Sequence, residues 1–135
     1  MPDFTLTTLP AITTLYACLL GIWIVGLSVW VVLLRNLDQV GIGTGESKRL
    51  ARAIRVQGNA VEYIPLGLLL MLLLELNGGA AGWLHGFGIA LLAGRLLHAQ
   101  GLGRRSGYSA GRLLGASITL LALLGLAICN LQLIF

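Results

Sequence analysis

Charged residues are scarce in this chain. Asp, Glu, Lys and Arg make up 10% of its 135 residues, against roughly a quarter in an ordinary soluble domain. Hydrophobic residues make up 57% of the sequence. This composition argues against a water-soluble fold and indicates an integral membrane protein.

Cysteine is scarce as well. The two cysteines, Cys18 and Cys129, both lie inside apolar runs and lack the spacing of metal ligands. The sequence therefore predicts neither a disulfide framework nor a metal site. We expect both cysteines to be small core residues.

Acidic residues are the rarer of the two charge types. Nine Lys and Arg stand against five Asp and Glu, a formal net charge of +4. In a membrane protein such an excess usually marks cytoplasmic loops, so it does not indicate a nucleic-acid partner.

Apolar residues are concentrated in four nearly uncharged stretches. Each quarter of the chain has about 34 residues, enough for one spanning helix of about 20 residues and a connector. The sequence predicts an all-α, integral membrane four-helix bundle that forms a single domain, residues 1–135. We expect helices at about 8–34, 48–76, 80–101 and 110–134, with Ser47 as the N-cap of the second.

The basic residues are grouped around two of the three connectors, whereas the second connector carries only Glu75. With four spanning helices, the first and third connectors lie on the same side of the membrane, and the positive-inside rule makes that side cytoplasmic. Both termini are then expected on the opposite side of what we predict to be a bacterial inner membrane. The basic residues are Arg35, Lys48, Arg49, Arg52 and Arg55 at the first connector and Arg95, Arg104, Arg105 and Arg112 at the third.

Three polar residues interrupt the second apolar segment. Arg55, Asn59 and Glu62 are spaced by four and three residues, so they share one face of a helix. A charge at the bilayer centre costs roughly 2.5 to 3.5 kcal/mol. Glu62 is therefore expected to face a bundle interior or a wet cavity, with Arg55 or Arg95 as its partner.

Further polar residues occur on the other segments. Arg95 and His98 lie three residues apart on the third, and Arg112 lies at the start of the fourth. In one interpretation, Glu62 and Arg95 form a structural ion pair. In the other, the guanidinium groups and Glu62 form a pocket for an anionic, partly zwitterionic ligand, because guanidinium groups bind carboxylates with two hydrogen bonds.

The spacing of Arg55, Asn59, Glu62, Tyr63 and Pro65 resembles the second-helix signature of the MAPEG family, the membrane-associated proteins in eicosanoid and glutathione metabolism, and in particular its microsomal glutathione S-transferases. The third segment is similar to that family's Arg-x-x-His motif, and the fourth carries a matching arginine. The matching residues are Arg95, His98 and Gly101 in the third segment and Arg112 in the fourth.

The resemblance implies a homotrimer that binds glutathione at subunit interfaces near the cytosolic face. Glutathione is then the co-substrate, conjugated to a lipophilic electrophile that arrives from the membrane lipids, and the function is detoxification; a glutathione peroxidase activity is also compatible with it. By motif position, Arg112 is the catalytic residue beside the sulfur. The glutathione-binding residues are Arg55, Asn59, Glu62, Tyr63, Arg95 and His98, with Gln57 and Arg35 contributed by a neighbouring subunit.

One position departs from the family pattern. Several catalytic members carry a tyrosine directly after the third-helix glycine, where this chain has Leu102, and Tyr108 is placed in the connector. The family also includes a member that binds lipid without catalysing a reaction. A noncatalytic membrane protein that binds lipid or glutathione is therefore the alternative function.

Overall fold

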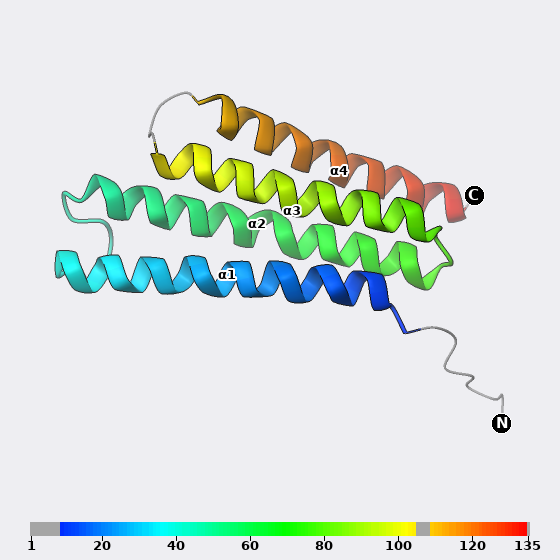
Figure 1. Ribbon diagram of the computed structural model, residues 1–135, viewed down its shortest axis with the longest axis horizontal. Helices are drawn as coiled ribbons and strands as arrows, with labels where there is room; N and C mark the ends of the chain where they lie inside the picture. Colours follow the sequence, from blue (N-terminus) through cyan, green and yellow to red (C-terminus); the bar gives the residue numbers. More distant parts are fainter. Residues whose placement is uncertain (1–8, 105–108, 135) are drawn as a thin grey trace.

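The chain forms a bundle of four helices lying side by side (Figure 1). The computed structural model describes residues 9–104 and 109–134. The helices are α1 (Ala11–Asp38), α2 (Lys48–Leu76), α3 (Ala81–Arg104) and α4 (Ala110–Ile134), and the described ranges contain no strand. The predicted all-α class with four helices is confirmed.

The helix bounds differ from the expected ones mainly at two C-terminal ends. α1 continues to Asp38 and α3 to Arg104, whereas the hydropathy pattern predicted ends near residues 34 and 101. Hydropathy marks only the apolar part of a helix, and α1 continues as a polar turn with Arg35, Asn36 and Asp38, whereas α3 continues past Gly101 through Leu102 and Gly103 to Arg104. The predicted start of the first helix, residue 8, lies outside the described residues.

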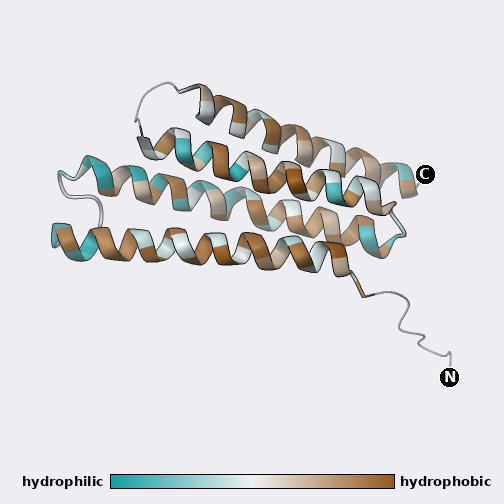
Figure 2. Cartoon of the chain, in the orientation of Figure 1, coloured by the Kyte–Doolittle hydropathy of each residue, from teal (hydrophilic) through white to brown (hydrophobic). Residues whose placement is uncertain are grey.

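Three of the described helices, α1, α2 and α4, are long and apolar enough to cross a membrane. α3 is not among them, although the sequence predicted four spans. Its C-terminal half carries Arg95, His98 and Gln100, which lower its hydropathy. In Figure 2, hydrophilic residues gather in the first half of α2 and at the adjoining end of α1, whereas α4 is largely hydrophobic.

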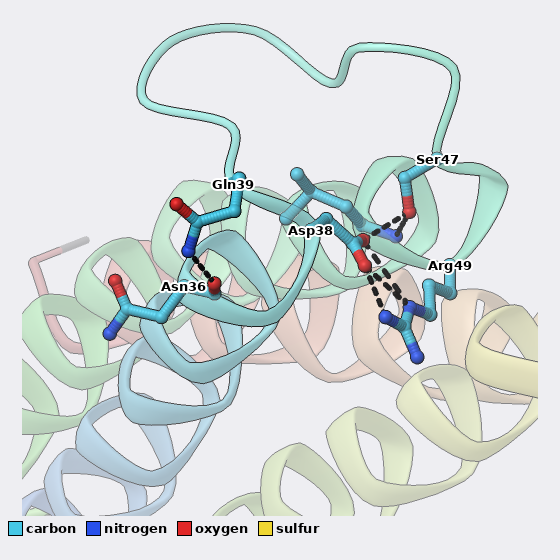
Figure 3. A network of polar contacts seen from close by, with 6 residues as sticks. Asn36, Asp38, Gln39, Ser47 and Arg49 are labelled. Atoms are coloured by element: carbon cyan, nitrogen blue, oxygen red, sulfur yellow. Dashed lines mark hydrogen bonds and ion pairs between the residues drawn. The ribbon is translucent and has the colours of Figure 1, made fainter.

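A polar network fastens the connector between α1 and α2 (Figure 3). The carboxylate of Asp38 accepts a hydrogen bond from the Ser47 hydroxyl and pairs with Arg49. Ser47 Oγ in turn accepts from the backbone N–H of Leu50 at 3.2 Å. This contact satisfies one of the free N–H groups at the start of α2, so the predicted N-cap is confirmed.

At the opposite end of the bundle, α2 is tied to the start of α1. The Glu75 carboxylate accepts hydrogen bonds from the backbone N–H groups of Ile12 at 2.9 Å and Thr13 at 2.7 Å. These N–H groups belong to the first turn of α1, where a helix has no internal acceptor for them and favours a negative charge.

We predict that Glu75→Gln lowers the free energy of unfolding by about 1 to 2 kcal/mol, because one charged acceptor and the interaction with the helix dipole are lost. Thermal unfolding in detergent measures the effect. Glu46→Gln is the matched control, since Glu46 is exposed in the connector. Equal unfolding temperatures for the two variants would contradict the role assigned to Glu75.

Candidate functional site

A cavity of about 350 Å³ lies between α2, α3 and α4, in the half of the bundle that contains the start of α2. Its lining is rich in basic side chains, and no Asp or Glu of residues 9–104 and 109–134 belongs to it. The lining residues are Lys48, Ala51, Arg52, Arg55, Asn59, His98, Leu102 and Arg112. A cavity with this lining favours an anionic ligand.

α2 supplies the basic wall of the cavity. Lys48, Arg52, Arg55 and Asn59 are spaced by four, three and four residues, so one face of the helix presents all four side chains. The helix is held in this orientation by Leu50, Ala53 and Val56 on its buried side.

Arg55 is the ion-pair partner of Glu62. Its Nη1 lies 3.8 Å from Glu62 Oε1, and the two side chains are 64% and 54% exposed on the single chain. Glu62 is therefore on the outer surface of the bundle, at the rim beside Arg55. The hypothesis of a structural ion pair between Glu62 and Arg95 is wrong, because Arg95 is directed to other partners.

Arg95 is buried between three helices, with 3% of its surface exposed. Its Nη1 donates to the side-chain oxygen of Asn59, and its Nε and Nη2 donate to Thr119 Oγ1 at 3.0 and 2.8 Å. The guanidinium carbon lies 5.2 Å from the centre of the Tyr63 ring, a distance typical of a cation–π interaction. Arg95 thus joins α2, α3 and α4 directly behind the cavity.

Glycines bring α3 and α4 into close contact beside the cavity. A Cβ at Gly115 would lie 2.8 Å from Cα of His98, and a Cβ at Gly101 would lie 2.8 Å from the carbonyl carbon of Gly111. Only residues without a side chain allow this approach, which is a common device in membrane helices. The contact carries His98 from α3 and Arg112 from α4 to the same cavity.

The structure therefore brings together four of the nine residues singled out from the sequence: Arg55, Asn59, His98 and Arg112 line one cavity. Glu62 is at its rim, and Tyr63 and Arg95 lie behind it.

Gln57 and Arg35 do not line the cavity. Gln57 Nε2 donates to Ser28 Oγ at 3.5 Å, and Arg35 donates to carbonyl oxygens of the first connector, including that of Gly43 at 3.0 Å. Tyr108 lies outside the described residues.

Sequence reasoning missed three features of the site. Lys48 could have been found, because it continues the spacing of Arg52 and Arg55 by one turn. Leu102 lines the cavity with 7% of its surface exposed, where only its difference from the family tyrosine had been noted. Thr119 lies in an apolar run, and no pattern marks it as a partner of Arg95.

A second cavity, of about 600 Å³, lies on the α1 side of α2 and α3. Its lining is mainly apolar and includes two tryptophans. The residues are Trp23, Gly26, Leu27, Trp30, Val56, Leu96, Leu97, Ala99 and Gln100. The α2–α3 pair thus separates a basic cavity from an apolar one.

Three helices apolar and long enough to span a membrane and a basic cavity in the bundle define a helical membrane protein with a candidate site for an anion. The MAPEG family matches residues 13–132, and the chain belongs to this family. It is 42% identical over 120 residues to the inner membrane protein YecN of Escherichia coli K12, covering 89% of this chain and 90% of YecN. YecN of Escherichia coli O6:H1 matches equally. With three apolar helices, this relationship supports an integral inner-membrane protein.

We predict that Gly115→Ala separates α3 from α4 and lowers the free energy of unfolding by about 1 to 3 kcal/mol, because the added methyl group meets the backbone of His98. Thermal unfolding in detergent measures the loss. Gly86→Ala is the control, since a Cβ there meets no atom within 4 Å. Unfolding of Gly115→Ala at the wild-type temperature would show that the two helices are not held at this distance.

Proposed function

We propose that this protein is a membrane-bound glutathione S-transferase whose glutathione site is the basic cavity. The observation that carries the proposal is the lining itself, in which Lys48, Arg55 and Arg112 converge and to which the described part of the chain contributes no acidic residue. Glutathione has two carboxylates, which suit guanidinium groups. Its single ammonium group suits Glu62, which lies beside Arg55 at the rim.

The role of Arg112 is activation of the thiol. A free thiol has a pKa of about 8.5, and a neighbouring cation lowers it, so that more of the nucleophilic thiolate is present at neutral pH. The sulfur of the thiolate then attacks the electrophilic carbon of the second substrate, and the leaving group departs with the bonding electron pair. Arg112 at the start of α4 lines the cavity opposite the basic face of α2.

A homotrimer belongs to the same proposal. In a single chain the charged pair of Arg55 and Glu62 is more than half exposed, although charges within membrane segments are normally covered by protein or water. Arg35 and Gln57 are directed away from the cavity of their own chain. Contact with a neighbouring subunit would cover the pair and let Arg35 and Gln57 reach that subunit's ligand.

The second substrate would come from the lipid phase. Lipophilic electrophiles concentrate in the bilayer, and the apolar helices α2 and α4, which contribute to the cavity lining, support access from that phase. Basic residues are gathered at the same end of the bundle as the cavity, and by the positive-inside rule this supports a glutathione site on the cytoplasmic side. Peroxidase activity toward lipid hydroperoxides would use the same thiolate.

One observation favours a second candidate, a noncatalytic protein that binds glutathione or a lipid. Leu102 lies in the cavity lining, at the position where several catalytic relatives have a tyrosine. Leucine offers no hydroxyl to a reacting group. Binding without turnover would support this candidate.

Isothermal titration of purified protein with glutathione, followed by turnover with chlorodinitrobenzene, tests the function. We expect wild-type protein to bind and conjugate glutathione. Arg55→Gln should weaken binding by about tenfold or more, because a charged hydrogen bond is worth roughly 1.5 to 3 kcal/mol. Arg49→Gln is the charge-matched control, since Arg49 pairs with Asp38 outside the cavity. Absence of glutathione binding to wild-type protein would refute the proposal.

Arg112→Ala tests thiol activation separately from binding. We expect a smaller ultraviolet thiolate signal of bound glutathione and slower conjugation, with a smaller change in affinity. Each unit by which the thiol pKa is lowered corresponds to about 1.4 kcal/mol of preference for the thiolate. Arg112→Lys should restore part of the signal, because a point charge remains. A full thiolate signal and normal turnover in Arg112→Ala would eliminate Arg112 as the activator.

A further inference from the structure

Arg95 determines which way the amide of Asn59 is turned. A guanidinium group can only donate hydrogen bonds, so the Asn59 atom that faces Arg95 Nη1 must be the oxygen. The Nδ2 group is therefore on the other arm of the amide. Among residues 9–104 and 109–134, Asn59 Nδ2 makes no hydrogen bond, and Asn59 lines the basic cavity.

Thr119 determines where Arg95 itself lies. Its hydroxyl oxygen accepts from both Nε and Nη2 of Arg95 and donates to the carbonyl of Gly115 at 2.9 Å. Thr119 is 1% exposed and does not belong to the cavity lining. Its side-chain hydrogen bonds connect it to the cavity lining through Arg95 and Asn59.

The charge of Arg95 is not neutralised by an acid. In the described part of the chain no carboxylate pairs with it, and its hydrogen-bond partners are the neutral groups of Asn59, Thr119 and Gly115. A buried cation with neutral partners keeps its positive field, which is screened less than at the surface.

Resting on the proposed function, we infer that Thr119 and Arg95 are positioning residues of the glutathione site: they hold Asn59 with its Nδ2 group toward the cavity, as a donor to a carboxylate or carbonyl oxygen of glutathione. The requirement is strict, because a reversed amide would present an oxygen to an anionic ligand. The site thus selects an oxygen acceptor at the position of Asn59, and a residue on α4 that never touches the ligand controls this selection.

Thr119→Val and Thr119→Ser test the inference by titration with glutathione. Valine has nearly the shape of threonine but no hydroxyl, and we expect affinity to fall about fivefold, the effect of one neutral hydrogen bond. Thr119→Ser should bind within about twofold of wild type, because the acceptor is retained. In an Asn59→Ala background, Thr119→Val should have no further effect, since residues that act through one another are not additive. Wild-type affinity of Thr119→Val, or an equal loss in both backgrounds, would overturn the inference.

Asn59→Asp provides a second test that does not depend on the stability of the threonine variants. The aspartate gives Arg95 a carboxylate partner, so we expect the unfolding temperature to be unchanged or higher. It also removes the donor from the cavity, so glutathione affinity should fall. Unchanged affinity of Asn59→Asp would contradict the role of Nδ2.

The side-chain NH₂ resonances of Asn59 report the same coupling without ligand. In detergent, Thr119→Val should shift these resonances and Thr119→Ser should leave them near their wild-type positions. Failure of wild-type protein to bind glutathione would refute the proposed function, whereas unshifted Asn59 resonances in Thr119→Val would refute the positioning role.

Discussion

The close contact between α3 and α4 is the constraint on which the rest of the site depends. Gly94, Gly101 and Gly115 leave no room for a Cβ between the two helices, and at this distance Thr119 comes within hydrogen-bond range of Arg95. Van der Waals contact between small residues is a major attraction that remains between helices in lipid, where the hydrophobic effect contributes little. Packing of these three glycines therefore determines both the position of a buried cation and the shape of a basic cavity.

Three charged sites of the bundle differ in how neighbouring groups stabilise the charge. Glu75 satisfies two N–H groups at the start of α1, so the charge stabilises the end of a helix. Arg95 is buried but surrounded by neutral acceptors, which satisfy its donors while leaving its field in place. Arg55 and Glu62 pair on the outer surface. A charge exposed to lipid is costly. The groups around Glu75 and Arg95 satisfy these two charges within one chain, whereas the exposed pair of Arg55 and Glu62 needs contact with another molecule to be shielded from lipid.

The sequence reveals features that depend on helix periodicity and conceals those that depend on contacts between helices. The stripe of Arg55, Asn59 and Glu62 follows from spacing alone, and three of the helices could be recognised as spans from hydropathy. The choice between Arg55 and Arg95 as the partner of Glu62 could not be made in advance, because it depends on how α3 is rotated against α2. The role of Thr119 as a partner of Arg95 could not be predicted for the same reason. A single threonine within an apolar run forms no periodic pattern, and its partner lies on another helix.

The two cavities on either side of α2 and α3 differ in polarity as the proposed function requires of sites for a water-soluble and a lipophilic substrate. The basic cavity is lined mainly by side chains that are positively charged or donate hydrogen bonds. It lies beside the polar first half of α2. The apolar cavity is lined by Trp23, Trp30 and aliphatic residues, at similar positions along α2 and α3. A water-soluble anion gains from the first lining and a lipophilic molecule from the second, because burial of apolar surface and pairing of charge favour opposite environments. In the proposed transferase, the helix pair that divides the two cavities would keep each substrate in its own phase.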